Sequence, residues 1–298
     1  MTGGSGFIGT PVISRLRRLG VEAVNVSRSG QGRHVIPADI GDRSTLQGIL
    51  TSGDVVIHLA NSGNPTTSEQ DRVRDIEENL IATLHLLESC AEKGVEKFIF
   101  ASSGGTVYGV PQVLPIPEVH PTNPISAHGA MKLAIEKYVQ VYGAQFGLKY
   151  VILRCANAYG PGQTGASGQG IIGRAIQVAL QDEPLELWGS GSAVRDFIFV
   201  EDVAEAFVLA AIGTASIEVV NIGTGKGTSI AEVIDLVGRA VGRPVQVVHL
   251  PGRQFDVPGN LLDIRKAKAL LDWEPRTALE EGIKRCHAWA SQRLEHSK

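Results

Sequence analysis

The chain opens on a glycine-rich turn that a helical pattern follows at once. Residues 2–9 read Thr-Gly-Gly-Ser-Gly-Phe-Ile-Gly, so Gly3, Gly6 and Gly9 recur at intervals of three. The first glycine can turn the chain tightly, the second admits a pyrophosphate to the backbone N–H groups, and the third lets the helix pack on its strand. A helix N-terminus adds positive potential. The spacing predicts a dinucleotide-binding loop that includes Phe7 and Ile8, although a flexible glycine-rich terminus would share this composition.

Almost nothing precedes this loop, whereas a loop of this kind follows a strand. That strand is central in a doubly wound sheet and is hydrogen-bonded on both sides. Its omission would leave buried backbone groups unpaired, at a cost of about 1–3 kcal/mol each. We therefore expect a Rossmann sheet whose first strand is largely absent from this chain. Either Met1 is an internal methionine with the native start several residues upstream, or expression-tag residues complete the strand.

The first two-thirds of the sequence alternates short apolar strands with amphipathic helices, which predicts βαβ units and an α/β, doubly wound parallel sheet. After about residue 157 glycine- and proline-rich loops separate shorter elements, as in a smaller α/β lobe. We predict a dinucleotide-binding domain over 1–156 plus about 193–222, and a substrate-binding lobe over 157–192 plus 223–298. The predicted strands cover residues 22–26, 34–37, 54–59, 97–101 and 149–153.

Composition narrows the function classes. The 298 residues carry a net charge of −3, which excludes a strong global attraction to nucleic acid or to an anionic membrane. No apolar run approaches the roughly 18 residues of a membrane-spanning helix, and no signal segment opens the chain. The 3 cysteines are widely spaced, so neither a disulfide framework nor a metal site is expected. We expect a cytoplasmic protein.

The ends of the next strands suggest how a dinucleotide would be held. An acidic residue about 20 positions after the glycine loop usually binds the ribose hydroxyls, and this chain has Ser27 and Arg28 there. That pair suits a 2′-phosphate, so NAD and NADP both remain open, as does a merely solvated Arg28. Two further pairs follow strands where they would line the adenine and the pyrophosphate: Asp39 with Ile40, and Leu59 with Ala60.

Further residues and motifs follow one another along the chain in this order: Asn79, Ser-Ser…Val-Tyr-Gly over 102–109, Lys132, Arg-Cys-Ala-Asn-Ala-Tyr-Gly-Pro over 154–161, Val-Arg-Asp over 194–196, Arg253 and Trp-Glu-Pro over 273–275. Together they resemble the extended short-chain dehydrogenases/reductases, most closely the nucleotide-sugar epimerases related to UDP-galactose 4-epimerase. The resemblance covers essentially the whole chain. It implies epimerisation of a UDP-hexose through a transient 4-keto sugar, with hydride held by a bound nicotinamide.

In that family a tyrosine removes the C4 hydroxyl proton and a lysine four residues later lowers its pKa. Here Lys132 is present, but the tyrosine position holds His128 and the usual Ser/Thr position holds Gly104. The nearest hydroxyls are those of Ser103 and Thr106. Imidazole can act as a base near neutral pH, so His128 either takes over the proton transfer or only lines a pocket. The phenols of Tyr108 and Tyr159 are the remaining candidates.

The resemblance also assigns other residues. It implies that Asn79 and Lys132 contact the cofactor, that Asn157 contacts substrate, and that Arg195 and Arg253 grip the diphosphate, for which guanidinium groups are suited. It further implies a homodimer through helices around 76–90 and 127–146.

Several alternatives stay open. A dehydratase is disfavoured because its acid–base pair would fall on Gly105 and Thr106. A nucleotide-sugar reductase would use the same site with a cofactor that exchanges after each reaction. A non-catalytic NAD(P)-binding protein is the other alternative, and it would explain the absence of the tyrosine.

Overall fold

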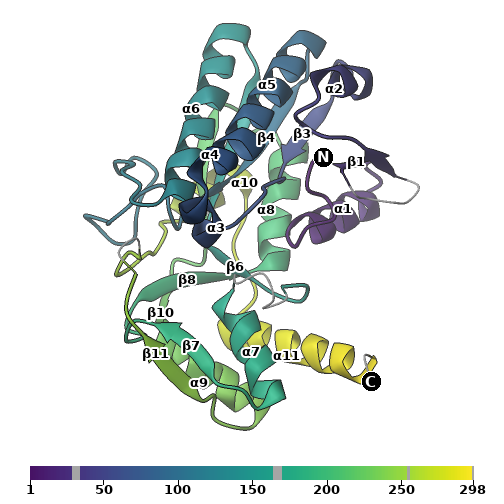
Figure 1. Ribbon diagram of the computed structural model, residues 1–298. Helices are drawn as coiled ribbons and strands as arrows, with labels where there is room; N and C mark the ends of the chain where they lie inside the picture. The colour runs from purple at the N-terminus through teal and green to yellow at the C-terminus, as the bar shows by residue number, and fades with distance from the viewer. Residues whose placement is uncertain (29–33, 164–169, 254–255, 297–298) are drawn as a thin grey trace.

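The computed structural model describes residues 1–28, 34–163, 170–253 and 256–296, and its larger lobe is built on a parallel sheet (Figure 1). The two-stranded unit β1–β2 and the four-stranded unit β3–β4–β5–β9 are parallel throughout. Thr2 joins the two units, because its backbone bridges Val26 on one side and His58 on the other. The strands are β1 (Asn25–Ser27), β2 (Val35–Pro37), β3 (Val55–His58), β4 (Lys97–Ser103), β5 (Lys149–Cys155) and β9 (Glu218–Ile222).

The predicted doubly wound sheet is confirmed, and the five predicted strands correspond to β1 to β5. In the central position, only Met1 and Thr2 lie between β1 and β3. Thr2 donates its N–H to Ile57 O at 3.0 Å and accepts from Leu59 N at 3.2 Å, and Met1 O accepts from Val26 N at 2.7 Å. The expectation that the native start lies upstream of Met1 stays a prediction.

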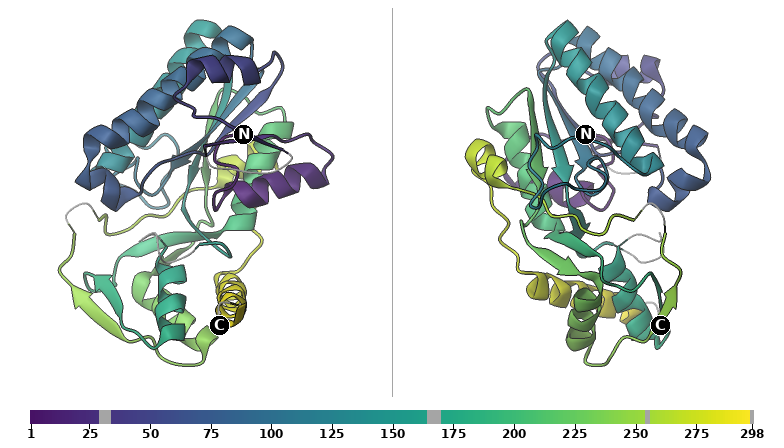
Figure 2. Two further views of the ribbon diagram at one scale, coloured as in Figure 1. Left: turned by 45° about the vertical axis from the view of Figure 1, so that its right-hand side comes forward. Right: turned by 90° about the vertical axis from the view of Figure 1, so that its left-hand side faces the viewer.

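Helices cover both faces of this sheet because its central strands are apolar on both sides. Phe98 and Phe100 of β4 pack with one cluster, whereas Ile99 between them packs with the other, as the period-two alternation of a strand requires. In the right-hand view of Figure 2 the two groups of helices lie on opposite sides of the sheet. One side carries α2 (Arg43–Ile49), α5 (Ala82–Lys93) and α6 (Ala127–Phe146), and the other α1 (Gly9–Arg18), α8 (Val200–Ile212) and α10 (Arg265–Leu271).

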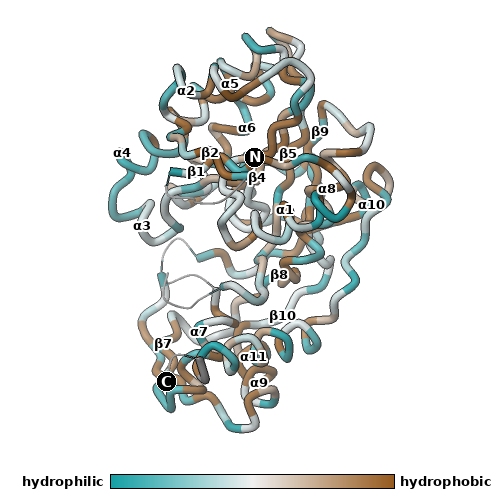
Figure 3. The backbone as a smooth tube through the Cα atoms, turned by 90° about the vertical axis from the view of Figure 1, so that its right-hand side faces the viewer, coloured by the Kyte–Doolittle hydropathy of each residue, from teal (hydrophilic) through white to brown (hydrophobic). Residues whose placement is uncertain are grey.

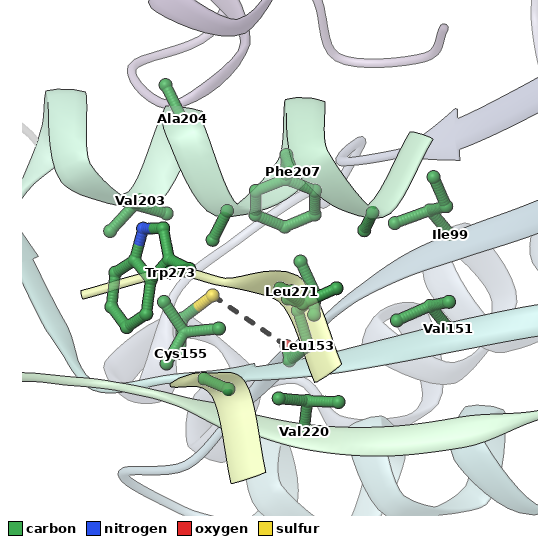
Figure 4. Packing of buried hydrophobic residues seen from close by; sticks show 14 of the residues in the cluster. Ile99, Val151, Leu153, Cys155, Val203, Ala204, Phe207, Val220, Leu271 and Trp273 are labelled. Atoms are coloured by element: carbon green, nitrogen blue, oxygen red, sulfur yellow. Dashed lines mark hydrogen bonds between the residues drawn. The ribbon is translucent and has the colours of Figure 1, made fainter. Parts of the chain in front are cut away.

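Figure 4 shows the second of these faces, where Phe207 and Val203 of α8 meet Trp273 and the β5 side chains Val151 and Leu153. The Trp273 indole is buried and donates to Asp202 O at 2.9 Å. Trp273 is therefore a packing residue that ties the C-terminal segment to α8.

The smaller lobe forms the lower half of the molecule in Figure 1. Strand β8 lies between β6, which is parallel to it, and β10, which is antiparallel, and β7 pairs with β11. Its own buried core draws on these strands and on α7, α9 and α11. The elements are β6 (Asn157–Tyr159), α7 (Ile171–Gln181), β7 (Leu185–Trp188), β8 (Val194–Phe199), β10 (Gly227–Ser229), α9 (Ile230–Val241), β11 (Val247–Leu250) and α11 (Leu279–His296).

Strand pairing refines the predicted division of the chain. Strand β8 pairs with β6 and β10 in the second lobe's sheet, and the helix that follows it, α8, packs against α1 of the larger lobe. Helix α10 then packs against β9 and α8 of the larger lobe, within the range predicted for the smaller one. The predicted boundaries between the dinucleotide-binding domain and the substrate-binding lobe stay a prediction.

Three short elements follow β3 and lie beside α6: α3 (Pro65–Gln70), α4 (Arg72–Asp75) and the π-helix η1 (Ile76–Ile81). Figure 3 shows hydrophobic stretches along the strands and α8, with polar stretches at α3 and α4. Within the described residues, no helix is both long and apolar enough to span a membrane.

Candidate active site

The glycine loop forms a cradle in which side chains have no room. Gly3 has φ +69°, and a Cβ there would lie 2.6 Å from the backbone nitrogen of Ala60. A Cβ on Gly9 would collide with the carbonyl oxygen of Gly3, so α1 can start against the loop only because residue 9 is glycine. Gly6 donates to Gly3 O at 3.0 Å and closes the turn. These contacts bring Leu59 and Ala60 beside the loop, and their contact with a cofactor stays a prediction.

The backbone around this cradle fits the diphosphate of NAD. The first residue of α1 is Gly9, and the N-terminal N–H groups of a helix attract an anion. Phe7 lies beside Gly162, since a Cβ on Gly162 would be 3.7 Å from the Phe7 ring. The loop therefore faces the second lobe, on the side where a dinucleotide would meet its substrate.

The residues predicted to line the adenosine half lie at the ends of β1 and β2. The loop is held to β1 by a 2.8 Å hydrogen bond from Gly4 N to Asn25 Oδ1. Ser27 is half-buried and Arg28 exposed. Asp39 is exposed and accepts from Gly41 N at 2.8 Å, while Ile40 is half-buried.

Asn79 contributes by holding another loop in place. It is buried in η1, and its Oδ1 accepts from Ser62 N at 2.8 Å while its Nδ2 donates to Ser62 O at 3.0 Å. The segment after β3 is thereby fixed. A contact of Asn79 with the cofactor stays a prediction, and its visible role is to shape the loop beside the cradle.

The corner after β4 explains why Gly104 replaces a hydroxyl residue. A Cβ on Gly104 would lie 2.6 Å from Leu262 Cδ1 and 2.9 Å from Arg154 O, so a serine does not fit without a shift. The two predicted hydroxyl groups flank this corner. The Ser103 Oγ would be 3.8 Å from a Cβ on Gly105. The Thr106 Oγ1 is buried and has no hydrogen-bond partner among the described residues.

Helix α6 presents His128 and Lys132 on one buried face, one turn apart. Ser126 caps the helix by accepting from Gly129 N at 3.2 Å, and Glu69 of α3 accepts from Ala127 N at 2.6 Å. Lys132 Nζ donates to Ala101 O at 3.1 Å and lies 5.0 Å from the centre of the Phe100 ring. Lys132 is therefore buried beside the end of β4 and is not a solvated helix cation.

Burial sets the protonation of both groups. It lowers the pKa of Lys132 to about 8. It also lowers the pKa of His128 to about 3, with a smaller contribution from the Lys132 charge. His128 Nδ1 has no hydrogen-bond partner in the described part of the chain. At neutral pH the imidazole is uncharged and can accept a proton.

Neither candidate tyrosine can replace the missing phenol. Tyr108 is buried and donates its hydroxyl to Asn221 Oδ1 at 2.7 Å. The hydroxyl of Tyr159 donates to Leu279 O at 3.3 Å. Burial raises the pKa of both phenols. Both tyrosines are packing residues.

The sequence reasoning missed a charged network that joins α6 to β5. Glu136, one turn after Lys132, is fully buried and forms a salt bridge with Arg154 of β5 at 2.6 Å. Ser102 donates to the same carboxylate at 2.5 Å. Arg154 also lies 4.8 Å from the Tyr108 ring centre. Two features of the sequence could have indicated this network. Arg154 stands inside an apolar strand, and Glu136 follows His128 and Lys132 at intervals of four residues.

The predicted substrate clamp lies in the second lobe. Burial lowers the pKa of Arg195, and the charge of Arg253 adds a smaller lowering, so the two guanidinium groups are within electrostatic reach of each other. Arg195 Nη1 donates to Val194 O at 2.9 Å, and Arg253 pairs with Asp256 at 3.0 Å. The Arg253 guanidinium also lies 5.6 Å from the centre of the Trp188 ring. The half-exposed indole of Trp188 was not predicted as a site residue.

Asn157 and Asn260 connect the second lobe to the corner after β4. A Cβ on Gly105 would be 3.5 Å from Asn157 Oδ1. Asn260 Nδ2 donates to Gly104 O at 2.8 Å, and its backbone N–H donates to Val194 O at 3.0 Å. The corner directly after β4 thus lies against two asparagines of the second lobe. No three metal-ligating side chains gather anywhere in the described ranges.

Comparisons with known proteins agree with this geometry. Residues 1–223 match the model of the NAD dependent epimerase/dehydratase family. The chain is 34% identical over 298 residues to UDP-glucose 4-epimerase of Mycolicibacterium smegmatis, which covers 95% of each protein. The crystal structure of a UDP-glucose 4-epimerase from Thermotoga maritima with UDP-glucose superposes with a TM-score of 0.93 at 36% identity, covering 98% of both chains. The Thermus thermophilus UDP-glucose 4-epimerase in complex with NAD gives 0.89 at 33% identity, covering 97% of both.

Proposed function

Because the chain belongs to the NAD dependent epimerase/dehydratase family, as its sequence motifs predict, we propose that it is a nucleotide-sugar 4-epimerase acting on a UDP-hexose. The observation that supports the proposal is the junction of the two lobes, where Phe7 lies beside Gly162 and Asn260 donates to Gly104 O, with three features on its two sides. These are the glycine cradle, the buried face of α6 and the arginine pair of the second lobe. The similarity to a structure that holds UDP-glucose supports the substrate class.

NAD bound in the cradle would take hydride from the sugar and return it. The cradle residues would hold its diphosphate, and the Lys132 ammonium group would contact its nicotinamide ribose. Arg195 and Arg253 bind the diphosphate of the substrate with charged hydrogen bonds. Trp188 offers an aromatic face beside Arg253 for the nucleotide base.

His128 accepts the C4 hydroxyl proton as the alcohol becomes a ketone, and returns it when the sugar is reduced from the other face. Forming an imidazolium in this buried position is costly. A pKa of about 3 is about 3.5 units below the usual value, or about 5 kcal/mol at 1.36 kcal/mol per unit. Proton transfer must therefore accompany the loss of hydride from C4, because the hydroxyl proton becomes much more acidic as the carbonyl forms. Ser103 and Thr106 supply hydroxyl groups at the same corner.

The test is to incubate the purified chain with UDP-glucose and UDP-galactose and to compare three variants. We expect interconversion by the natural chain and a loss of at least about a hundredfold in His128→Ala, the usual contribution of a general base. His128→Tyr should retain or raise the rate. The control is Tyr159→Phe, which removes a phenol outside the site and should leave the rate unchanged.

Two outcomes would contradict the proposal. Equal rates in the natural chain and in His128→Ala would remove His128 from the reaction. Dinucleotide binding without turnover of any UDP-hexose, in the natural chain or in His128→Tyr, would establish the alternative of a non-catalytic NAD(P)-binding protein. The low pKa of His128 is the observation that favours that alternative.

We also propose that two copies of the chain associate through η1, α5 and α6, as the resemblance implies. Apolar side chains on and beside these helices stay exposed: Val73, Ile76, Ile81, Tyr138 and Val141 are each at least 40% exposed. Light scattering on the purified protein should give twice the chain mass, and Ile76→Lys with Val141→Lys should reduce it to one. A monomer in the natural chain would refute this assignment.

A further inference from the structure

The corner after β4 has little rigidity of its own. It contains two consecutive glycines, Gly104 and Gly105, and glycine leaves the backbone freer than any other residue. Gly104 N donates to Cys155 O at 2.8 Å, which ties the start of the corner to β5. The peptide group between the two glycines has to be held by another contact, because its rotation would move the hydroxyl groups of Ser103 and Thr106 relative to each other.

The side chain of Asn260 holds that peptide group. Asn260 is 1% exposed, and its Nδ2 donates to Gly104 O at 2.8 Å. A carbonyl oxygen can only accept, so this contact also fixes which end of the amide faces the corner.

Stability alone does not account for an asparagine at this position. The Asn260 Oδ1 is buried and has no hydrogen-bond partner among the residues that the structure describes. A buried acceptor without a partner costs at least as much stability as a typical hydrogen bond contributes. The amide is thus retained although its oxygen is unsatisfied, which points to a role in the site.

The backbone of Asn260 ties this contact to the second lobe. Its N–H donates to Val194 O at 3.0 Å, and Val194 N donates to Pro258 O at 3.0 Å. Val194 is the first residue of β8 and directly precedes Arg195 of the predicted substrate clamp. One residue therefore joins the clamp through its backbone and the corner through its side chain.

Helix α6 lies against the same corner. A Cβ on Gly129 would lie 2.7 Å from Thr106 O, so the backbone of Thr106 rests on the first turn of the helix, beside His128. A Cβ on Gly104 would in turn meet Leu262 Cδ1 at 2.6 Å. The corner is enclosed between α6 and the segment 256–263, and a shift of its backbone changes the distance from its hydroxyl groups to the helix.

We propose that Asn260 is a positioning residue for the epimerisation. Its side-chain amide fixes the peptide group between Gly104 and Gly105 and thereby holds Ser103 and Thr106 against the face of α6 that carries His128. The inference rests on the proposed function, because it concerns the rate of that reaction.

The experiment compares the steady-state interconversion of UDP-glucose and UDP-galactose, with saturating NAD⁺, in the natural chain and in Asn260→Leu, which has nearly the same size but no donor. A displacement of about 1 Å can slow a reaction about a hundredfold, so we expect kcat to fall about tenfold to a hundredfold. The KM of the UDP-hexose and the Kd of UDP, from isothermal titration, should change less than about twofold, because the backbone of Asn260 still holds β8 beside Arg195. Asn260→Ala, which cannot clash, should give the same result and replaces Asn260→Leu if that variant does not fold.

Lys97→Met is the matched control. Lys97 is 4% exposed at the opposite end of β4, and its Nζ donates to the backbone carbonyl oxygens of Ala210 and Gly213 at 3.1 and 2.6 Å. Its replacement by a methionine of similar length removes both donors. The urea midpoint should therefore fall at least as much as in Asn260→Leu, while kcat stays unchanged.

The outcomes separate this proposal from the proposed function. An unchanged kcat in Asn260→Leu and Asn260→Ala, or an equal fall of kcat in Lys97→Met, would overturn the positioning role and leave the proposed epimerase intact. A rise in KM or in the Kd of UDP with kcat unchanged would assign Asn260 to the clamp and would also overturn it. Absence of turnover in the natural chain would overturn both.

Discussion

Replacing Glu136 by glutamine should strongly destabilise the protein. The substitution keeps the shape of the side chain but removes the negative charge that faces Arg154. The Arg154 side chain is only 5% exposed and that of Glu136 is 0% exposed, so water cannot take over the lost interaction. Three hydrogen bonds of 2.6 to 3.2 Å join the two groups. Removing one partner of such a buried pair costs about 3–5 kcal/mol.

The assay is equilibrium unfolding in urea at pH 7, followed by circular dichroism. Glu78→Gln is the matched control, because Glu78 forms an exposed pair with Arg74 four residues earlier, and such pairs contribute only about 0.3–0.5 kcal/mol. The double variant Glu136→Leu with Arg154→Met should recover most of the loss, since it leaves no unpaired buried charge.

Two results would refute this reasoning. A loss below about 1 kcal/mol in Glu136→Gln would show that the buried charge is not held by this pair. Additive losses in the double variant would show that the two side chains act independently. Titration with NADH in the same variants would then show whether the position of Lys132 depends on Glu136.

The remaining predictions concern the acid stability of the protein and the Gly104 corner. His58 and His128 both have a pKa of about 3 in the fold, chiefly because of burial, against about 6.5 when unfolded. Their neutral forms therefore contribute stability that is present above pH 6.5 and lost as pH falls toward 3; from pH 7 to pH 5 urea unfolding should show a loss of about 2 kcal/mol per histidine. His128→Gln should reduce the loss of stability between pH 7 and pH 5, whereas His34→Gln, a change at an exposed site, should not. Equal stability of the natural chain at pH 7 and pH 5 would contradict this prediction. Gly104→Ala should cost about 1–3 kcal/mol in thermal or urea unfolding, because its Cβ would meet Leu262 and the Arg154 backbone. Gly105→Ala, whose Cβ would have no neighbour closer than 3.5 Å, should cost nothing, and equal effects of the two would disprove the steric account.

The parts that local pattern specifies could be predicted from the sequence. Strands such as β4 and β5 are apolar on both faces, which predicts a parallel sheet covered by helices on both sides. The glycine spacing of the first loop predicts a cradle because only glycine permits those backbone contacts. His128 and Lys132 could be placed on one face because four residues make about one helical turn.

Other features depend on contacts between distant segments and have no local pattern. The role of Asn260 is one example, because its partners Gly104 and Val194 are 156 and 66 positions away. The sheet that β8 joins is another example, because β8 finds its partners, β6 and β10, only in the folded lobe. Tyr108 and Tyr159 could be excluded as bases only when the acceptors of their hydroxyl groups were known.

By itself the sequence determined the class of fold, the dinucleotide loop and the two positions that depart from the pattern of the family it resembles. These are His128 in place of tyrosine and Gly104 in place of serine or threonine. Only the tertiary structure decided what those residues experience. The protonation of His128 depends on how much water surrounds it, and burial on α6 beside Lys132 is a property of the packed molecule. Gly104 is required because Leu262 and Arg154 occupy the space of a side chain, a fact that no spacing of residues in the sequence could reveal.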